Sequence, residues 1–402
     1  MIRIRLLLPL LVLGAALTAI VAADLRARAP QAGAPDLIVA DIPDAYEWGT
    51  SGGMSAYTFA TTSCNLGTVP LSWVSNTNQH PVIGGNLFRL KDGVLEQLGT
   101  SWVKHGFTAL NGTLCGNCQP TAGDSLGVMC SDPYSASLNG YWSYLGPRSE
   151  INAYDGYFPY PPILDPPTNS VLDRRIQVPN VDVDPALNAG ARYFAECQYV
   201  HPEDNALLGN GENNVSYREV TISGSTPPFN LGFVGATVRE KMAIEAWQAI
   251  DPQVSIAKVQ FPNDGSMFVA SRVYDQGNGT WKYVYVLYNR DSDRGARGLG
   301  IPVDVNTMIS NRTFRDVDHH SGEPIQTTDW VELDGPVSTF PRVIGWACGK
   351  YSSDPSNPGL RWGNALTVTF VADTPPVTGQ MAVLAFRGSG PAYQVVTTNV
   401  PQ

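Results

Sequence analysis

Two apolar runs joined by a short polar turn set the first limit on how this chain can fold. Ser266–Tyr274 and Trp281–Asn289 are rich in Val, Tyr and Phe, which favour extended backbone. The five residues between Tyr274 and Thr280 read DQGNG, and Gly and Asn tolerate the positive φ angles of tight turns. The pattern predicts an antiparallel hairpin, and the second run, apolar at consecutive positions, is typical of a central sandwich strand.

Comparable short runs elsewhere predict a mainly β protein. Loops dense in Gly, Asn, Asp and Pro separate these runs, in line with 39 Gly, 31 Pro and only 15% charged residues. We expect two β-sandwich-like domains with long ordered loops, the C-terminal one immunoglobulin-like or related to that fold. The other expected strands are 56–61, 71–74, 86–90, 192–200, 298–303, 343–347, 366–372 and 381–386.

One segment has the pattern of a helix. Thr237 and Glu240 stand three residues apart, as in a capping box, and apolar residues then recur at helical spacing as far as Ile250. Pro252 follows and should end the helix. We expect one short helix near the junction between the two domains.

The N-terminus predicts export. Two arginines precede an apolar run that ends in Val-Ala-Ala, as in a signal peptide, although the run is also long enough for an uncleaved membrane anchor. In both cases the rest of the chain is secreted, extracellular or periplasmic, with a membrane tether only through the N-terminus. The expected divisions are 1–23 (signal peptide or anchor), 24–35 (spacer), 36–227 (loop-rich N-terminal β domain), 228–256 (junction with the helix) and 257–402 (C-terminal β-sandwich domain).

Cysteine content agrees with export. An even number of cysteines in an oxidising compartment predicts three disulfides, and a segment with three closely spaced cysteines should be held by at least one of them. A redox pair or half of a thiolate metal site is the alternative for the Cys-Gly-Asn-Cys string. The candidates are Cys64, Cys115, Cys118, Cys130, Cys197 and Cys348.

Histidines are few, five in all, and neutral imidazole is the commonest ligand for transition metals. If antiparallel strands bring His80 and His105 together and His320 approaches across the domain interface, the three form a copper or zinc site. Met129 is a candidate soft fourth ligand for copper. The alternative is ordinary hydrogen-bonded histidines, because no two histidines have a spacing typical of metal ligands.

Oxygen-rich loops indicate structural calcium. Asp182 and Asp184 alternate in one loop, and Glu203 and Asp204 lie in another. Carboxylate and amide oxygens are the ligands that calcium prefers, and such sites brace long extracellular loops. The alternative is solvated turns capped by their own side chains.

Carboxylate catalysis needs an acid and a base in one cleft. Asp132 and Glu150 are the candidates, and Arg148 is expected on the same strand face as Glu150, where the two can simply pair. The surrounding segment is rich in aromatic residues that can form a platform for stacking sugars. These are Tyr141, Trp142, Tyr144 and Tyr154.

Four strings resemble an uncharacterised family of secreted bacterial β-rich proteins. They are SWVKHGFTAL at 101–110, CSDPYSASLNG at 130–140, LGPRSEIN at 145–152 and LRWG at 360–363. The resemblance implies secretion and one continuous architecture, and it carries no activity, cofactor or catalytic residue.

Charge excludes one class of partner. The chain has 36 acidic and 26 basic residues, a net charge of −10, and no basic stripe, so nucleic acid is not an expected partner. The first functional hypothesis is an extracellular metal-binding β protein, with copper-dependent oxidoreduction as its sharpest form. The alternatives are a glycan-binding or glycan-degrading protein, with a polysaccharide or cell-surface component as partner, and a non-catalytic cell-surface or matrix protein.

Overall fold

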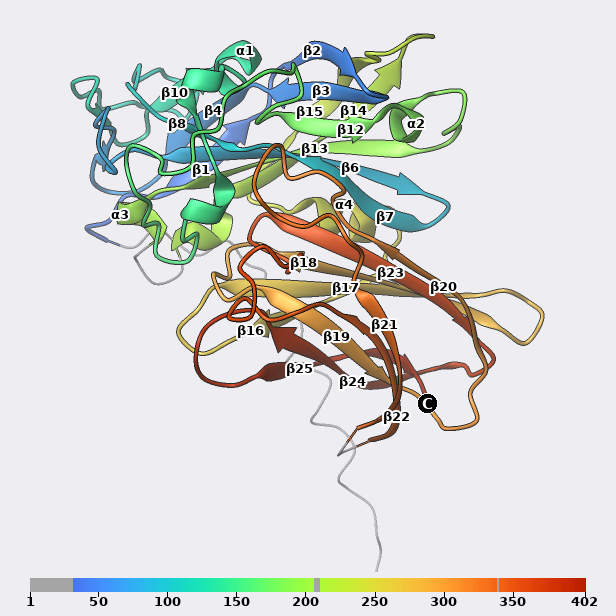
Figure 1. Cartoon of the computed structure of the whole chain (residues 1–402). Coiled ribbons are helices and arrows are strands. Elements are labelled where there is room, and N and C mark those ends of the chain that lie inside the picture. Colours follow the sequence, from blue (N-terminus) through green and yellow to red (C-terminus); the bar gives the residue numbers. More distant parts are fainter. Residues whose placement is uncertain (1–31, 206–209, 338–339) are drawn as a thin grey trace, which may run out of the picture.

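The structure, a computed structural model, describes residues 32–205, 210–337 and 340–402. It confirms a mainly β fold with sandwich-like packing of several sheets. Two groups of sheets are stacked on one another (Figure 1), and the chain completes the first group before it enters the second. The immunoglobulin-like topology and the exact domain limits stay predictions, and the expected signal peptide and most of the spacer lie outside the described residues.

The first group holds three sheets of three or more strands. A seven-stranded sheet, in the order β11-β8-β6-β13-β14-β15 with β7 beside β6, packs against two three-stranded sheets, β12-β3-β2 and β1-β4-β10, and their shared core includes Tyr57, Leu87 and Tyr199. The strands are β1 (Leu37–Asp41), β2 (Ala45–Ser51), β3 (Met54–Phe59), β4 (Thr61–Asn65), β5 (Leu71–Ser72), β6 (Val82–Lys91), β7 (Val94–Thr100), β8 (Val103–His105), β9 (Ser125–Leu126), β10 (Ser131–Tyr134), β11 (Leu145–Gly146), β12 (Ile176–Pro179), β13 (Arg192–Val200), β14 (Val215–Ser223) and β15 (Asn230–Val238).

The second group is a sandwich of two five-stranded sheets, β16-β17-β18-β23-β20 and β21-β22-β19-β24-β25, which enclose one apolar core. The expected hairpin is confirmed: β17 and β18 pair in antiparallel fashion, and Gly277 and Gly279 in the turn have positive φ. The strands are β16 (Ser255–Gln260), β17 (Ser266–Asp275), β18 (Trp281–Asn289), β19 (Ala296–Pro302), β20 (Ile309–Arg315), β21 (Val331–Val337), β22 (Phe340–Ala347), β23 (Asn364–Ala372), β24 (Pro376–Ala385) and β25 (Tyr393–Pro401).

Helices are short. They are α1 (Ala136–Asn139), α2 (Asn180–Val183), α3 (Pro202–Asn205) and α4 (Ala243–Ile250), with 3-10 turns at Trp142–Tyr144, Arg148–Glu150 and Asn210–Asn213. Within the described part of the chain, no helix is long and apolar enough to cross a bilayer.

The two groups are joined by a buried layer. Helix α4 lies between them (Figure 1), and Trp247 packs in one cluster with Phe88 and Phe194 of the first group and with Val286 and Tyr288 of the second. Glu196 is fully buried in this layer and accepts hydrogen bonds from Asn86 Nδ2, Tyr288 Oη and the amide of Ala243, at 2.8, 3.0 and 2.7 Å. The junction is therefore a continuous interior.

The predicted start of the helix is wrong. Strand β15 continues to Val238, and α4 begins at Ala243, where Glu245 accepts the amide hydrogen of Met242. Thr237 instead donates to Asp41 Oδ1 at 2.6 Å and accepts the amide of Ile42, so its hydroxyl holds the segment against the end of β1. Glu240 has a φ of 59°, outside the helical region. The glutamate half of a capping box thus occurs five residues further on, at Met242 and Glu245, without a hydroxyl partner.

The expectation of three disulfides is also wrong. Cys64 is bonded to Cys115 and Cys118 to Cys130, whereas Cys197 and Cys348 are free. Cys197 lies in the middle of β13 with its side chain in the first core, and Cys348 follows β22 in the other group of sheets. The Cys64–Cys115 bridge ties the segment between β8 and β10 to β4, and the Cys118–Cys130 bridge closes a loop within that segment. The two bridges indicate an oxidising compartment.

Candidate functional site

His80 and His105 come together as predicted from antiparallel strands. His105 is the last residue of β8 and is paired with Val82, the first residue of β6. His80 lies two residues before Val82. The two rings meet with His80 Nε2 2.9 Å from His105 Nδ1, and both side chains are buried. Phe158 and Tyr160 lie against both rings, with centroids 5.2 to 5.5 Å away.

Hydrogen-bond partners assign the protons on this pair. His80 Nδ1 lies 3.2 Å from the carbonyl oxygen of Val74, which can only accept, so this nitrogen carries the hydrogen. His80 Nε2 therefore accepts from His105 Nδ1. His105 Nε2 is left without a partner and faces Gly146, where a Cβ atom would come within 2.5 Å of it. Burial lowers the pKa of His80 to about 4 and that of His105 to about 3, so both rings are neutral.

This pair predicts a loss of stability in acid. The folded pKa values lie below the unfolded value near 6.5, so the stabilisation is complete above that pH and is lost as the pH falls towards 4. We expect the stability advantage of the wild type over a His80→Gln/His105→Gln variant to fall by about 1.4 kcal/mol per pH unit for each ring. Urea unfolding at several pH values between 7.5 and 4.5 measures this difference, and a difference independent of pH would contradict the assignment.

Lys104 and Asp132 are two further buried polar residues, and Lys104 is next to His105 in β8. Lys104 Nζ lies 3.3 Å from the ring centroid of Tyr134 and donates to the carbonyl of His105. Asp132 Oδ1 accepts the amide of Leu110 at 2.7 Å, whereas Oδ2 has no partner. Burial raises the pKa of Asp132 to about 7 and lowers the pKa of Lys104, while their mutual attraction opposes both shifts. Asp132 is thus closed off from solvent, which does not fit a residue that meets a substrate.

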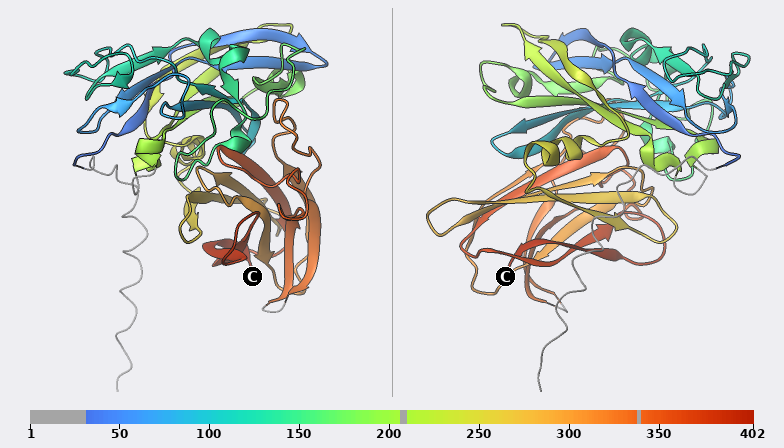
Figure 2. Two further views of the ribbon diagram at one scale, coloured as in Figure 1. Left: turned by 60° about the vertical axis from the view of Figure 1, so that its left-hand side comes forward. Right: turned by 180° about the vertical axis from the view of Figure 1, so that it is seen from behind.

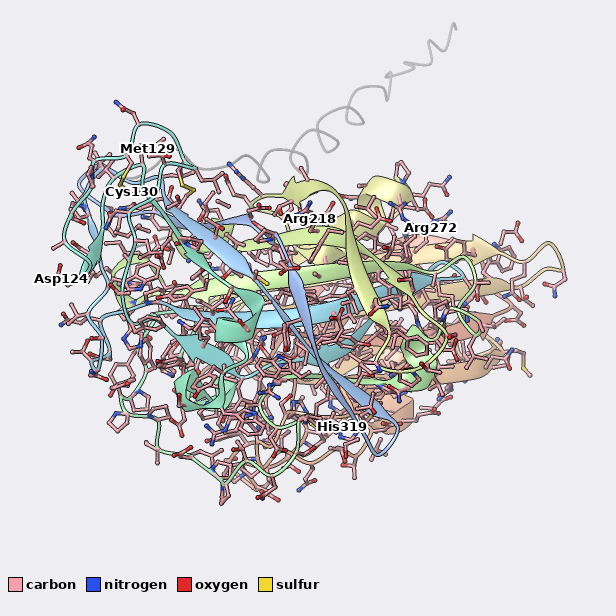
Figure 3. The ribbon with its side chains drawn as sticks, turned by 90° about the horizontal axis from the view of Figure 1, so that it is seen from above. Asp124, Met129, Cys130, Arg218, Arg272 and His319 are labelled. Carbon is pink, nitrogen blue, oxygen red and sulfur yellow. A yellow bond between two sulfur atoms is a disulfide. The ribbon has the colours of Figure 1, made fainter. Side chains whose placement is uncertain are left out.

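Met129 and His320 do not join the histidine pair. His320 lines a cavity of about 10 Å³ with Asp316 and Arg361. Met129 packs against Gly116 in the segment held by the disulfides, and Figure 3 shows it far from His319, the residue next to His320. Among the residues that the structure describes, no three His, Cys, Asp or Glu side chains are placed to hold one metal ion. The predicted copper site thus keeps two of its four ligands, and these two are bonded to each other.

Candidate calcium ligands are already engaged by protein donors. Asp182 forms ion pairs with Arg89 and Arg315, at 3.0 and 2.7 Å. Glu203 accepts from the amide and hydroxyl of Ser72, and burial raises the pKa of Asp204 to about 8, so it is protonated at neutral pH. Asp184 accepts the amide of Ala186 in a turn. These contacts use the candidate ligands to hold the loops together.

Arg148 and Glu150 do not pair, and the expected strand face is a 3-10 turn. The buried guanidinium of Arg148 donates to the carbonyls of Ser101, Gly85 and Gly363, so it ties loops of both groups of sheets together. Glu150 accepts the amides of Ile163 and Leu164. Both side chains are thus hydrogen-bonded to backbone groups, which is a structural role and not that of a catalytic acid or base.

Exposed aromatic rings form the one site-like surface that the sequence partly predicted. Tyr141, Trp142 and Tyr144 follow α1, and Tyr141 and Tyr144 lie 5.6 Å apart between ring centroids. The structure adds Tyr46 and Trp48 of β2, whose rings lie 4.7 Å apart. Tyr46 is 46% and Tyr141 55% exposed, so these rings present open faces to solvent. We call these five residues the aromatic face.

Arg175 joins the two halves of the aromatic face. Its guanidinium lies 3.4 Å from the Trp48 ring centroid and 4.6 Å from that of Trp142, so it is stacked between the two indoles. It also donates to the carbonyls of Gly140 and Val171. Gly140 has to be glycine, because a Cβ there would come within 2.6 Å of Trp48 Nε1. The two indole rings are thus fixed before any ligand arrives.

Tyr154, the fourth predicted platform residue, lies elsewhere. It lines a polar cavity of about 190 Å³ between the two groups of sheets, together with Glu212, Asp264, Arg290 and Asp291. The acids are engaged there: Glu212 with Lys258, Asp264 with the amide of Asp293, and Asp291 with Arg290. The cavity is a polar gap in the interface between the groups.

The sequence reasoning missed Tyr46, Trp48 and Arg175. Tyr46 and Trp48 are two residues apart, a spacing that places both on one face of a strand, and this spacing could have marked β2. No signal in the sequence relates them to residues almost a hundred positions later. No protein-family model and no curated protein sequence matches the chain.

Proposed function

We propose that the protein binds extracellular glycans through the aromatic face. The observation that carries the proposal is a set of exposed tyrosine rings beside two half-buried indoles, Trp48 and Trp142, which Arg175 holds in place. A pyranose presents C–H groups on its flat sides, and these pack on the electron-rich face of an aromatic ring. Exposed apolar clusters with fixed geometry are typical of binding sites.

Binding fits the surface better than hydrolysis does. Of the carboxylates that the sequence nominated, Asp132 is buried and Glu150 holds two backbone amides. The chain carries a net charge of −10, which disfavours acidic polysaccharides because like charges repel. We therefore infer a neutral polysaccharide as ligand.

Affinity electrophoresis against soluble neutral and acidic polysaccharides tests the proposal. Tryptophan fluorescence provides a second readout, because Trp48 and Trp142 lie at the centre of the face. Retardation and a fluorescence change with at least one neutral polysaccharide are expected, and neither with polyuronates. No response to any polysaccharide would overturn the proposal.

A further inference from the structure

A second surface stands out in the other group of sheets, and it is independent of the glycan proposal. Sheet β21-β22-β19-β24-β25 lies on the side of the sandwich away from the first group (Figures 1 and 2). Its inward residues, such as Ile344, Trp346 and Val383, fill the sandwich core. The alternate residues of each strand therefore point outward. We call this outward side the outer sheet face.

The outer sheet face carries no charge. At the paired outward positions from Gly298 to Pro401, the side chains are apolar, glycine, or the neutral polar residues Gln380, Thr378, Thr397 and Asn399. Its large side chains are open to solvent: Val331 is 68%, Val395 51% and Tyr393 55% exposed. On a sheet with one face in water, the outward side chains of each strand are normally polar or charged. The outer sheet face lacks such side chains over much of its area, which is typical of a surface that a partner covers.

The face also has relief. Register places Val331, Ala347, Gly298, Leu384 and Tyr393 in one row across the five strands. The next row has Leu333, Gly345, Gly300, Ala382 and Val395. Large side chains thus occupy the two edges of these rows, with Gly and Ala between them, and Val343 and Leu384 pack beside Gly300 and Gly298. A second copy related by a two-fold axis presents the same uncharged rows, and a two-fold interface needs a patch that matches itself.

We propose that the outer sheet face pairs with the same face of a second copy of this chain. Five strands about 4.8 Å apart and about seven residues long at about 3.4 Å per residue cover roughly 600 Å². Two copies then bury about 1,200 Å², the lower end of the range for specific interfaces. The charge distribution also favours a second copy as the partner. Two chains that each carry a net charge of −10 repel one another, and the uncharged outer sheet face is a surface through which they can approach without placing like charges together.

Sedimentation velocity of the full chain over a range of about 1 to 200 μM tests the proposal, because a dimer of this area should have a micromolar or weaker dissociation constant. The wild type should shift from monomer to dimer as concentration rises. Leu333→Glu and Val395→Glu should each raise the dissociation constant at least tenfold. Val181→Glu, which adds the same charge at an exposed residue of α2 in the first group, is the matched control and should associate like the wild type.

Thermal unfolding of the wild type and the three variants shows whether each variant is still folded. All four should have similar midpoints, since substitutions at exposed positions should leave the monomer folded. A wild type that stays monomeric across the range would overturn the proposal, as would variants that associate as it does. Co-sedimentation of a monomeric wild type with phosphatidylcholine vesicles or insoluble polysaccharide, lost in Leu333→Glu, would show that another partner covers this face and would equally overturn it.

Discussion

Replacement of Glu196 by alanine is expected to lower the free energy of unfolding by about 3 to 5 kcal/mol, because it leaves buried hydrogen-bond donors unpaired. The carboxylate is fully buried and binds Asn86 of β6, Tyr288 of β18 and the first amide of α4. Alanine would leave the Tyr288 hydroxyl and the Ala243 amide buried without this acceptor and would remove one of the two acceptors of Asn86 Nδ2, and each unpaired hydrogen carries its own desolvation cost. Urea unfolding followed by tryptophan fluorescence measures the effect.

Two variants separate this effect from a general loss of charge. Glu196→Gln keeps one acceptor oxygen and should cost about 1 to 2 kcal/mol. Glu219→Ala removes a carboxylate from the neighbouring strand β14, where it forms an ion pair with the partly exposed Arg192, and should cost less than about 1 kcal/mol. Equal losses for Glu196→Ala and Glu219→Ala would show that the interface does not depend on the buried carboxylate.

Removal of two rings from the aromatic face is expected to abolish most glycan binding. Tyr46→Ala and Tyr141→Ala should each weaken binding about tenfold, since a stacked aromatic anchor commonly contributes more than 1.4 kcal/mol. The two residues lie on opposite halves of the face, on β2 and after α1. The double variant should therefore bind about a hundredfold more weakly if the losses add. Isothermal titration with the polysaccharide that binds best gives the three dissociation constants.

Tyr157→Ala is the matched control for the ring variants. Tyr157 is about as exposed as Tyr141, 59% against 55%, but it belongs neither to the aromatic face nor to the outer sheet face, so its removal should leave glycan affinity unchanged. Unfolding midpoints should stay close to the wild type for all of these variants, because exposed rings add little to folding. A control that weakens binding as much as the face variants would place the glycan elsewhere.

Sequence patterns predicted the strands where the information is local. Strands β13 and β18 occupy the expected residues. Strand β17 ends one residue later than expected, and β19, β22, β23 and β24 each begin a few residues earlier. Strands such as β15 and β25 were missed because their faces are half exposed and mix Gly, Thr and Asn with apolar residues. The capping signal at Thr237 failed because its hydroxyl bonds to Asp41, almost two hundred residues away.

The site was less accessible from sequence, because it depends on contacts between distant segments. Antiparallel pairing brought His80 to His105 as expected. His320 did not follow, since the loop that carries it packs against Arg361 instead. Burial of Lys104 has no sequence signature, because lysine is normally exposed. The aromatic face joins β2 to the segment after α1 through Arg175, a relation that only the fold reveals.

Hydroxyl-radical footprinting by mass spectrometry, with and without a bound neutral polysaccharide, tests the glycan proposal most directly. Radicals oxidise exposed aromatic side chains, so a ligand protects the rings that it covers. The proposal predicts protection of Tyr46, Trp48, Tyr141, Trp142 and Tyr144, with Tyr157 and Tyr393 oxidised as fast as in the free protein. Protection of other rings while the aromatic face stays reactive would contradict it.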